Sequence, residues 1–358
     1  MGIKKEMNEQ VVFLEGKHVG VTGANGFLGS YICKLLNEKG AIIHAYIYPG
    51  TSTTIIKKEV SESGGEIKTI DITKPQTLFG KFDDIEYLFH IAGTVAEWAH
   101  PVQKIFDINF RGARNVHSEA KTAGVKRTVH TSTMAAGGSC PTPDAVTSED
   151  APWDMQGTGP YSISKHLGDL IAQKFNQPGV YETVRVRPHQ ILGWGDTGPS
   201  APGQLVLQAI TRGFPAYIDQ VTQVVHVQDV ADAHIAAMER GKAGIVYNIA
   251  SKKPIPVNIF LQYVCKVANV KPPLPIAIPK WILRIVAAFS ETLSEKVTHK
   301  PPLLTRGNAR MLYKNTGTSI ERACRELGFN PRPWQEAVKD AVRWFREGYK
   351  PVKRTYDR

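Results

Sequence analysis

A glycine-rich turn near the start of the chain constrains the fold more than any other feature. Residues 19–30 read VGVTGANGFLGS, a β-branched run that passes through glycines directly into the apolar-periodic segment 31–36. Gly23 lets the chain turn sharply off a strand, Gly26 removes the side chain where a pyrophosphate approaches the backbone, and Gly29 allows close helix–strand packing. Unpaired N–H groups at the positive end of the helix then bind phosphate. A tight turn without a ligand is the alternative, but alternating strand-like and helical stretches follow and favour nucleotide binding.

Those later stretches predict an α/β fold with a doubly wound parallel sheet of Rossmann type. Strand-like runs at 41–48, 65–72, 85–94 and 127–133 alternate with helical patterns, which places a ligand at the carboxyl ends of the strands. We expect an N-terminal extension over 1–16 and a dinucleotide-binding domain over 17–192 to which 223–250 returns. The remaining boundaries place a smaller, mostly helical substrate lobe at 193–222 and 251–345, and a basic tail at 346–358.

Composition narrows the class of protein. The 358 residues are 42% hydrophobic and 22% charged, which is ordinary for a globular protein. Four cysteines lie far apart without a C-x-x-C pair, so we expect no disulfide framework, no metal site and a reducing, cytoplasmic compartment. We expect neither a signal peptide nor a membrane-spanning helix. The net charge of +11 is scattered, which favours a solvated surface and a phosphate-bearing cofactor over nucleic acid.

The end of the second strand bears on the choice between NAD and NADP. An acidic residue there would hold the free 2′-hydroxyl of NAD, and a basic one would accept the 2′-phosphate of NADP. This chain offers Tyr48, then a run of threonines and serine, then Lys57, so the missing acid slightly favours NADP. Asp71, followed by Ile72, either contacts the adenine or caps the next segment. Small residues at 92–94 (Ala92, Gly93, Thr94) allow a cofactor to lie against the backbone.

A hydroxyl-bearing strand end and a tyrosine–lysine pair converge in the middle of the chain. Thr131-Ser132-Thr133 closes a strand, and Tyr161 and Lys165 lie four residues apart on the helix that follows, so they share one face. Tyrosine, with a pKa of about 10, is a poor proton carrier at neutral pH unless a nearby cation favours the phenolate. The pair alone occurs by chance, but its place after that strand favours an acid–base site.

At this point the chain resembles the extended short-chain dehydrogenase/reductase family, of the NAD-dependent epimerase/dehydratase type. The resemblance runs from about residue 17 to the C-terminal helix. It rests on the motifs TGANGFLG (22–29), HIAG (90–93), DINFRG (107–112), Tyr161 to Lys165, RPHQILGWG (187–195) and VHVQDVADAH (225–234).

The resemblance implies roles for individual residues. Tyr161 would be the acid–base catalyst, Lys165 would bind the nicotinamide ribose, and Thr133 would hold the substrate oxygen with Ser132 as second choice. Asn109 would support the site, and Pro188 and Ile191 would contact the carboxamide. The glycine turn would bind the cofactor through Gly23, Asn25, Gly26, Phe27, Leu28 and Gly29. We expect substrate contacts from Trp98, Trp194 and His189, although a packed histidine is the alternative for His189.

The C-terminal third is proline-rich and holds the most apolar segment, 274–289. Ile282, Ile285, Val286 and Phe289 recur with helical spacing, which predicts an amphipathic helix whose apolar face packs on the core. A lid over an apolar substrate is one alternative. The other is peripheral membrane contact through 279–290, which Trp281, Lys280 and Arg284 would suit.

By resemblance, the chain looks most like the 3β-hydroxysteroid and sterol dehydrogenase branch, which implies a hydride transfer between NAD(P) and a bulky apolar alcohol or ketone. A nucleotide-sugar epimerase or dehydratase with tightly bound NAD is the alternative within enzymes. A non-catalytic dinucleotide sensor is a further class, and the intact Tyr161–Lys165 pair argues against it. A homodimer is implied by the resemblance alone.

Overall fold

A computed structural model describes residues 13–139, 145–154, 159–312 and 317–350. The predicted extension and tail therefore lie partly outside the described residues, at 1–12 and 351–358. So does Cys140.

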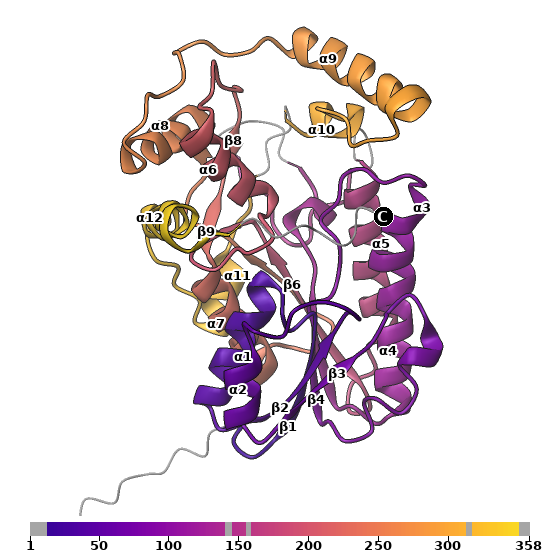
Figure 1. Ribbon diagram of the computed structural model, residues 1–358. Coiled ribbons are helices and arrows are strands. Elements are labelled where there is room, and N and C mark those ends of the chain that lie inside the picture. The colour runs from indigo at the N-terminus through magenta and orange to yellow at the C-terminus, as the bar shows by residue number, and fades with distance from the viewer. Residues whose placement is uncertain (1–12, 140–144, 155–158, 313–316, 351–358) are drawn as a thin grey trace, which may run out of the picture.

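A seven-stranded parallel sheet forms the centre of the N-terminal half, in the order β10-β6-β5-β4-β1-β2-β3 (Figure 1). The order reverses between β1 and β4, as in a doubly wound sheet, and confirms the predicted Rossmann-type fold. Both faces are covered, so the central strands are buried runs such as β1, HVGVT. The strands are β1 (His18–Thr22), β2 (Ile42–Ile47), β3 (Glu66–Thr69), β4 (Tyr87–His90), β5 (Arg127–Thr131), β6 (Glu182–Pro188) and β10 (Val246–Ile249).

Helices pack on the two faces of this sheet. One face carries α1 (Phe27–Glu38), α2 (Lys57–Glu62), α7 (Val227–Arg240) and α11 (Glu321–Leu327). The other carries α3 (Gln103–Phe106), a π-helix (Asp107–Gly112), α4 (Ala113–Thr122) and α5 (Pro160–Phe175).

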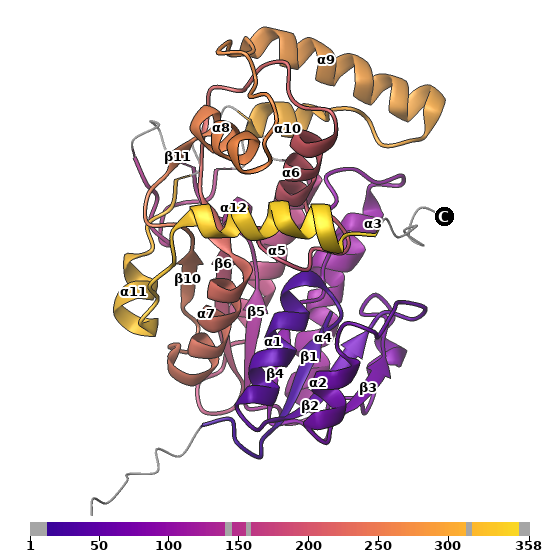
Figure 2. The ribbon, with the colours of Figure 1, turned by 60° about the vertical axis from the view of Figure 1, so that its left-hand side comes forward.

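A second hydrophobic cluster forms the lobe above the carboxyl ends of the strands (Figure 2). It is built from α6 (Ala201–Thr211), α8 (Val257–Val267) and α12 (Trp334–Arg343), with the strand pairs β7 (Gln190–Leu192)–β9 (Val224–His226) and β8 (Val221–Thr222)–β11 (Ile255–Pro256). Of the segment 223–250, which was predicted to return to the dinucleotide-binding domain, β10 joins the main sheet and β9 does not. Because β10 occupies the free edge of β6, β9 pairs instead with β7.

The segment 274–289 contains a cap helix, α9 (Lys280–Leu293), followed by α10 (Arg306–Met311). The predicted core-facing positions are only partly correct. Leu283 and Ala287 are the buried residues of α9, whereas Ile285 is 60% exposed and Phe289 is 70% exposed. The helix is apolar on more than one side, so its periodicity alone does not select the face that packs inward.

Candidate active site

The glycine turn joins β1 to α1 in the predicted way. Gly23 has φ +69°, and a Cβ there would lie 2.9 Å from the Ala92 nitrogen. A Cβ on Gly29 would lie 2.2 Å from the Gly23 carbonyl oxygen, so only glycine permits this contact. Gly26 caps α1 with an extended backbone and no side chain. The first-turn N–H groups of α1 thus face the end of the sheet, which fits a pyrophosphate.

The other residues predicted to bind the cofactor lie in the glycine turn and at the ends of the strands. Leu28 is buried, and Phe27 packs edge-on against Tyr31. The Asn25 amide donates to the Thr51 hydroxyl at 2.8 Å and thereby connects the turn to the loop after β2. Tyr48 is 45% exposed at the start of that loop.

Asp71 caps the segment after β3, which was one of its two predicted roles. Its Oδ1 accepts hydrogen bonds from the Thr73 amide at 3.0 Å and hydroxyl at 2.7 Å, and Lys74 lies 3.3 Å from Oδ2. Burial raises the pKa of Asp71, but these hydrogen bonds and the lysine outweigh it and leave the pKa below its usual value. Ile72, next in sequence, is buried and would contact a Cβ on Gly112.

Asn109 joins three elements of the site from the π-helix. Its Oδ1 accepts from the Thr94 amide at 2.8 Å, and its Nδ2 donates to the Thr94 carbonyl and the Ser164 hydroxyl, both at 3.0 Å. A Cβ on Gly93 would lie 3.1 Å from Asn109 Oδ1 and 3.8 Å from Lys165 Nζ. The loop after β4 therefore needs a small residue where it passes between these side chains.

Tyr161, Thr133 and Lys165 come together at the start of α5. Burial raises the pKa of Tyr161 to about 12, and a hydrogen bond with Thr133 acts in the opposite direction. Lys165 Nζ donates to the Thr131 carbonyl at 2.7 Å, and burial lowers its pKa to about 8. Burial therefore outweighs the hydrogen bond and leaves the pKa of Tyr161 above its ordinary value. The buried Ser132 hydroxyl has no partner among the described residues.

The remaining predicted residues lie after β6. Pro188 ends that strand and pairs with Ile249, and Ile191 in β7 pairs with Val225. His189 is buried, its amide donates to Ile249 and its Nδ1 accepts from the Gln190 amide, as expected of a packed histidine. Trp194 packs edge-on against Trp344, with ring centroids 5.1 Å apart.

A cavity of about 510 Å³ lies beside the start of α5. Its described wall includes Trp98 and Pro160, the residue before Tyr161, whereas neither His189 nor Trp194 lines it. The substrate contact of Trp98 stays a prediction. The sequence reasoning missed Glu97, which also lines the cavity. An acidic residue inside the otherwise apolar loop 95–99 was the available signal.

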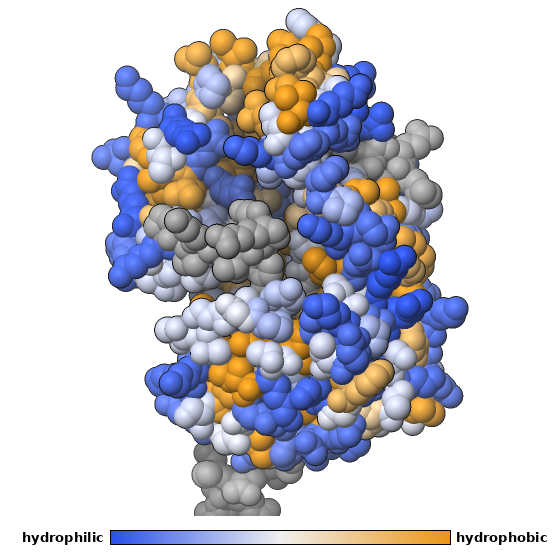
Figure 3. Space-filling model, turned by 45° about the vertical axis from the view of Figure 1, so that its right-hand side comes forward, coloured by the Kyte–Doolittle hydropathy of each residue, from blue (hydrophilic) through white to orange (hydrophobic). Residues whose placement is uncertain are grey.

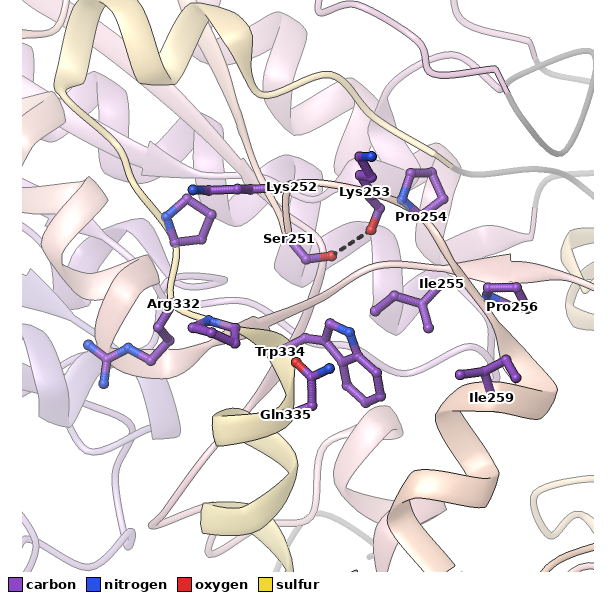
Figure 4. Close-up of a pocket in the computed structure, with 12 residues that line it drawn as sticks. Ser251, Lys252, Lys253, Pro254, Ile255, Pro256, Ile259, Arg332, Trp334 and Gln335 are labelled. Atoms are coloured by element: carbon purple, nitrogen blue, oxygen red, sulfur yellow. Dashed lines mark hydrogen bonds between the residues drawn. The ribbon is translucent and has the colours of Figure 1, made fainter.

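A larger cavity, of about 620 Å³, lies between the β10–β11 loop and the start of α12 (Figure 4). Trp334 faces Ile255 and Ile259 across it, and Arg332 lies at its edge, where it pairs with Asp229 at 2.7 Å. None of its lining residues comes from the strand ends or from α5. Of the two cavities, the smaller is the one that a residue of α5, Pro160, lines.

Comparisons with known proteins agree with this geometry. The family described as "NAD dependent epimerase/dehydratase family" matches residues 19–250. "Sterol demethylase protein B" of Methylococcus capsulatus is 27% identical, over 91% of this chain and 98% of the relative. A "2-alkyl-3-oxoalkanoate reductase" of Shewanella oneidensis is 24% identical, over 87% and 82%. The crystal structure of gox2253 superposes with a TM-score of 0.80 at 30% identity, over 92% of this chain and 98% of that one.

Proposed function

Because this chain belongs to the NAD-dependent epimerase/dehydratase family, we propose that it transfers a hydride between a nicotinamide cofactor and a secondary alcohol or ketone of a bulky, largely apolar substrate. It is an enzyme of the dehydrogenase/reductase kind. The observation that carries the proposal is the Tyr161–Thr133 hydrogen bond beside the cavity that Pro160 and Trp98 line. A sterol-like or long-chain keto substrate suits the apolar part of that wall.

The chain's own residues orient the substrate, donate the proton and bind the cofactor. When bound, the nicotinamide supplies or accepts the hydride. Thr133 orients the substrate oxygen, and Tyr161, protonated at neutral pH, donates a proton to that oxygen as the carbonyl is reduced. Lys165, held by the Thr131 carbonyl, binds the nicotinamide ribose, and Asn109 fixes the loop that passes beside it. Pro188 and Ile191 contact the carboxamide.

The cofactor binds along the carboxyl edge of the sheet, with its pyrophosphate on the turn from Gly23 to Gly29. NADP is slightly favoured over NAD, since Tyr48 stands where an acidic residue would select NAD. Titration with NADH and NADPH tests this, and tighter binding of NADPH is expected. Equal or tighter binding of NADH would overturn the preference, and binding of neither would overturn the cofactor site.

A nucleotide-sugar epimerase or dehydratase is the second candidate, and the family's own description favours it. The two differ in stoichiometry, because the epimerase oxidises its substrate only transiently. Absorbance of the reduced nicotinamide is followed with a sterol, a β-keto lipid and a UDP-sugar. We expect cofactor consumption in proportion to product with the apolar substrates. Conversion of the sugar without net consumption would establish the second candidate.

Helix α9 suits a membrane surface as a peripheral contact. Trp281, Ile285 and Phe289 recur every four residues and are 63%, 60% and 70% exposed, and hydrophobic surface gathers at this end of the molecule (Figure 3). The exposed cations Lys280 and Arg284 flank them and suit anionic lipid headgroups. No helix in the described residues is long and apolar enough to cross a membrane.

Flotation with vesicles tests this contact. We expect binding to phosphatidylcholine vesicles that contain phosphatidylglycerol, and about tenfold weaker binding when Trp281 and Phe289 are replaced by serine. Phe79→Ser, at an exposed phenylalanine outside α9, is the matched control. Equal flotation of all three proteins would rule out α9 as the contact.

The homodimer stays a prediction, tested by sedimentation for a species of twice the chain mass.

A further inference from the structure

Glu97 is half-buried near the proposed proton donor, and one oxygen of its carboxyl group, Oε2, is fully buried. It lies in the loop between β4 and α3, and its Oε2 is buried without a hydrogen-bond partner among the described residues. Oε2 is 3.3 Å from the point where a Cβ on Gly159 would lie, and Gly159 precedes Tyr161 by two residues. The charge of Glu97 also raises the pKa of Tyr161. A buried, unpaired polar atom is costly, so its retention here calls for a function.

The cavity that Glu97 lines carries one sign of charge. Its described wall holds three carboxylates, Glu97, Glu291 and Glu295, and no lysine or arginine. Glu291 accepts from the Arg306 amide at 2.9 Å and pairs with its guanidinium at 3.7 Å, and Glu295 is exposed. Among the described residues of this wall, Glu97 is therefore the carboxylate that has a buried oxygen and no paired cation. In Figure 1, α9 and α10 lie above α3 and the start of α5.

We propose that Glu97 is a specificity-determining residue, which admits neutral ketones and alcohols and disfavours substrates that carry a carboxylate or phosphate near the reacting carbon. This inference rests on the proposed function. A like charge in a water-poor cavity repels an incoming anion more strongly than it would in water, which is how a site rejects a competitor. A substrate hydroxyl, in contrast, donates a hydrogen bond to Oε2 and pairs the buried atom.

Burial supports a pH dependence of this selection, because it raises the pKa of Glu97 to about 7. Below that pH the carboxyl is neutral and repels less. Among the described residues, the other titratable groups that line the cavity are His100 from the same loop, Glu291 from α9 and Glu295 from the π-turn after it. Beyond this lining, the ring of His299 lies 5.2 Å from that of His100, and Tyr161 interacts electrostatically with Glu97.

The test compares 4-oxodecanoate with its methyl ester, a pair that differs in charge. We measure kcat/KM for NADPH-dependent reduction and, by calorimetry, binding of each probe to the protein with NADP. The wild type should prefer the ester by about tenfold or more, and Glu97→Gln should reduce that ratio about tenfold. The ratio should rise from pH 6 to pH 8 in the wild type and stay flat in the variant. Glu336→Gln, an exposed glutamate on α12, controls for net charge.

The outcomes separate the two proposals. An ester-to-acid ratio that Glu97→Gln leaves unchanged, in turnover and in binding, overturns the role of Glu97 while the reductase assignment stands. Binding selectivity that depends on Glu97, without reduction of either probe or of the apolar ketones above, supports the role of Glu97 and overturns the reductase. An equal change of the ester-to-acid ratio in Glu97→Gln and Glu336→Gln would mean that the net charge of the protein determines the ratio, and would overturn the specific role of Glu97. Melting temperatures of both variants check that they are folded.

Discussion

The sheet and the cap helix α9 use apolar side chains in different ways. In the sheet, residues such as Val21, Val129 and Val184 are fully buried, because helices cover both faces. In α9, Leu283 and Ala287 alone are buried, while Trp281, Ile285 and Phe289 are exposed. A strand packed from both sides holds the side chains at its end rigidly, as catalysis requires. A helix packed from one side keeps a surface free for a substrate or a membrane.

The largest effect is expected from a substitution near the strand ends of the sheet, at the proposed proton donor. Tyr161→Phe should lower turnover by about 10²- to 10⁴-fold, since it removes the proton donor and leaves the packing of the ring intact. Cofactor affinity, measured by titration, should change little, because the glycine turn is untouched. Turnover within threefold of the wild type would assign the proton transfer to another residue.

A second prediction compares the two sides of α9 itself. Leu283→Ala should cost about 2–4 kcal/mol of unfolding free energy, because it leaves a cavity under the helix. Phe289→Ala, on the exposed side, should stay within about 0.5 kcal/mol. Urea unfolding measures both. A comparable cost for the two substitutions would mean that the outer face is covered in solution, for instance by a second chain.

The third prediction concerns stability in acid, because buried histidines lie where α4 packs on the sheet: His117 on α4, and His90 and His130 on β4 and β5. His117 bonds to the Tyr181 hydroxyl at 2.7 Å and to His130 at 3.1 Å, and burial lowers its pKa from 6.5 to about 3. The unfolded chain therefore takes up this proton first. The stabilisation is complete above about pH 6.5 and is lost as the pH falls towards 3, about 2 kcal/mol by pH 5 for this residue alone.

Urea unfolding at pH 7.5 and pH 5 measures this loss. His117→Gln should show a smaller decrease between the two pH values than the wild type does, whatever its stability at pH 7.5. His299→Gln, at an exposed histidine near the cap, is the control and should follow the wild type. An unchanged pH dependence in His117→Gln would show that other groups determine acid stability.

The features of the fold and of the site that the sequence predicted are those that depend on local sequence. The turn at Gly23 and Gly29 was predictable, because its requirement is local: a positive φ at one position and no space for a Cβ at the other. The helix pairing of Tyr161 and Lys165 was predictable for the same reason. The resemblance implies that Thr133 holds the substrate oxygen, which stays a prediction; its hydrogen bond with Tyr161 is a finding of the structure.

The features that were missed depend on distant packing. The burial of Glu97 arises where its loop meets Gly159 and the segment before α10, about 60 and 210 residues further along the chain, a meeting that no local pattern encodes. The pKa of Tyr161 follows burial rather than its neighbour Lys165, whose amine is directed to the Thr131 carbonyl. The inward side of α9 and the pairing of β9 with β7 likewise depend on competition between surfaces far apart in sequence.

The π-helix at Asp107–Gly112 has a consequence for how this site can change. A π-turn contains one residue more than the α-turn it replaces, and each residue of an α-helix advances about 100° around the axis. Deleting a single residue before Asn109 would restore a regular helix and swing its amide away from Thr94 and Ser164. The alignment of the site thus depends on the number of residues in this segment as well as on the identity of Asn109, so that even the shortest deletion would disrupt it.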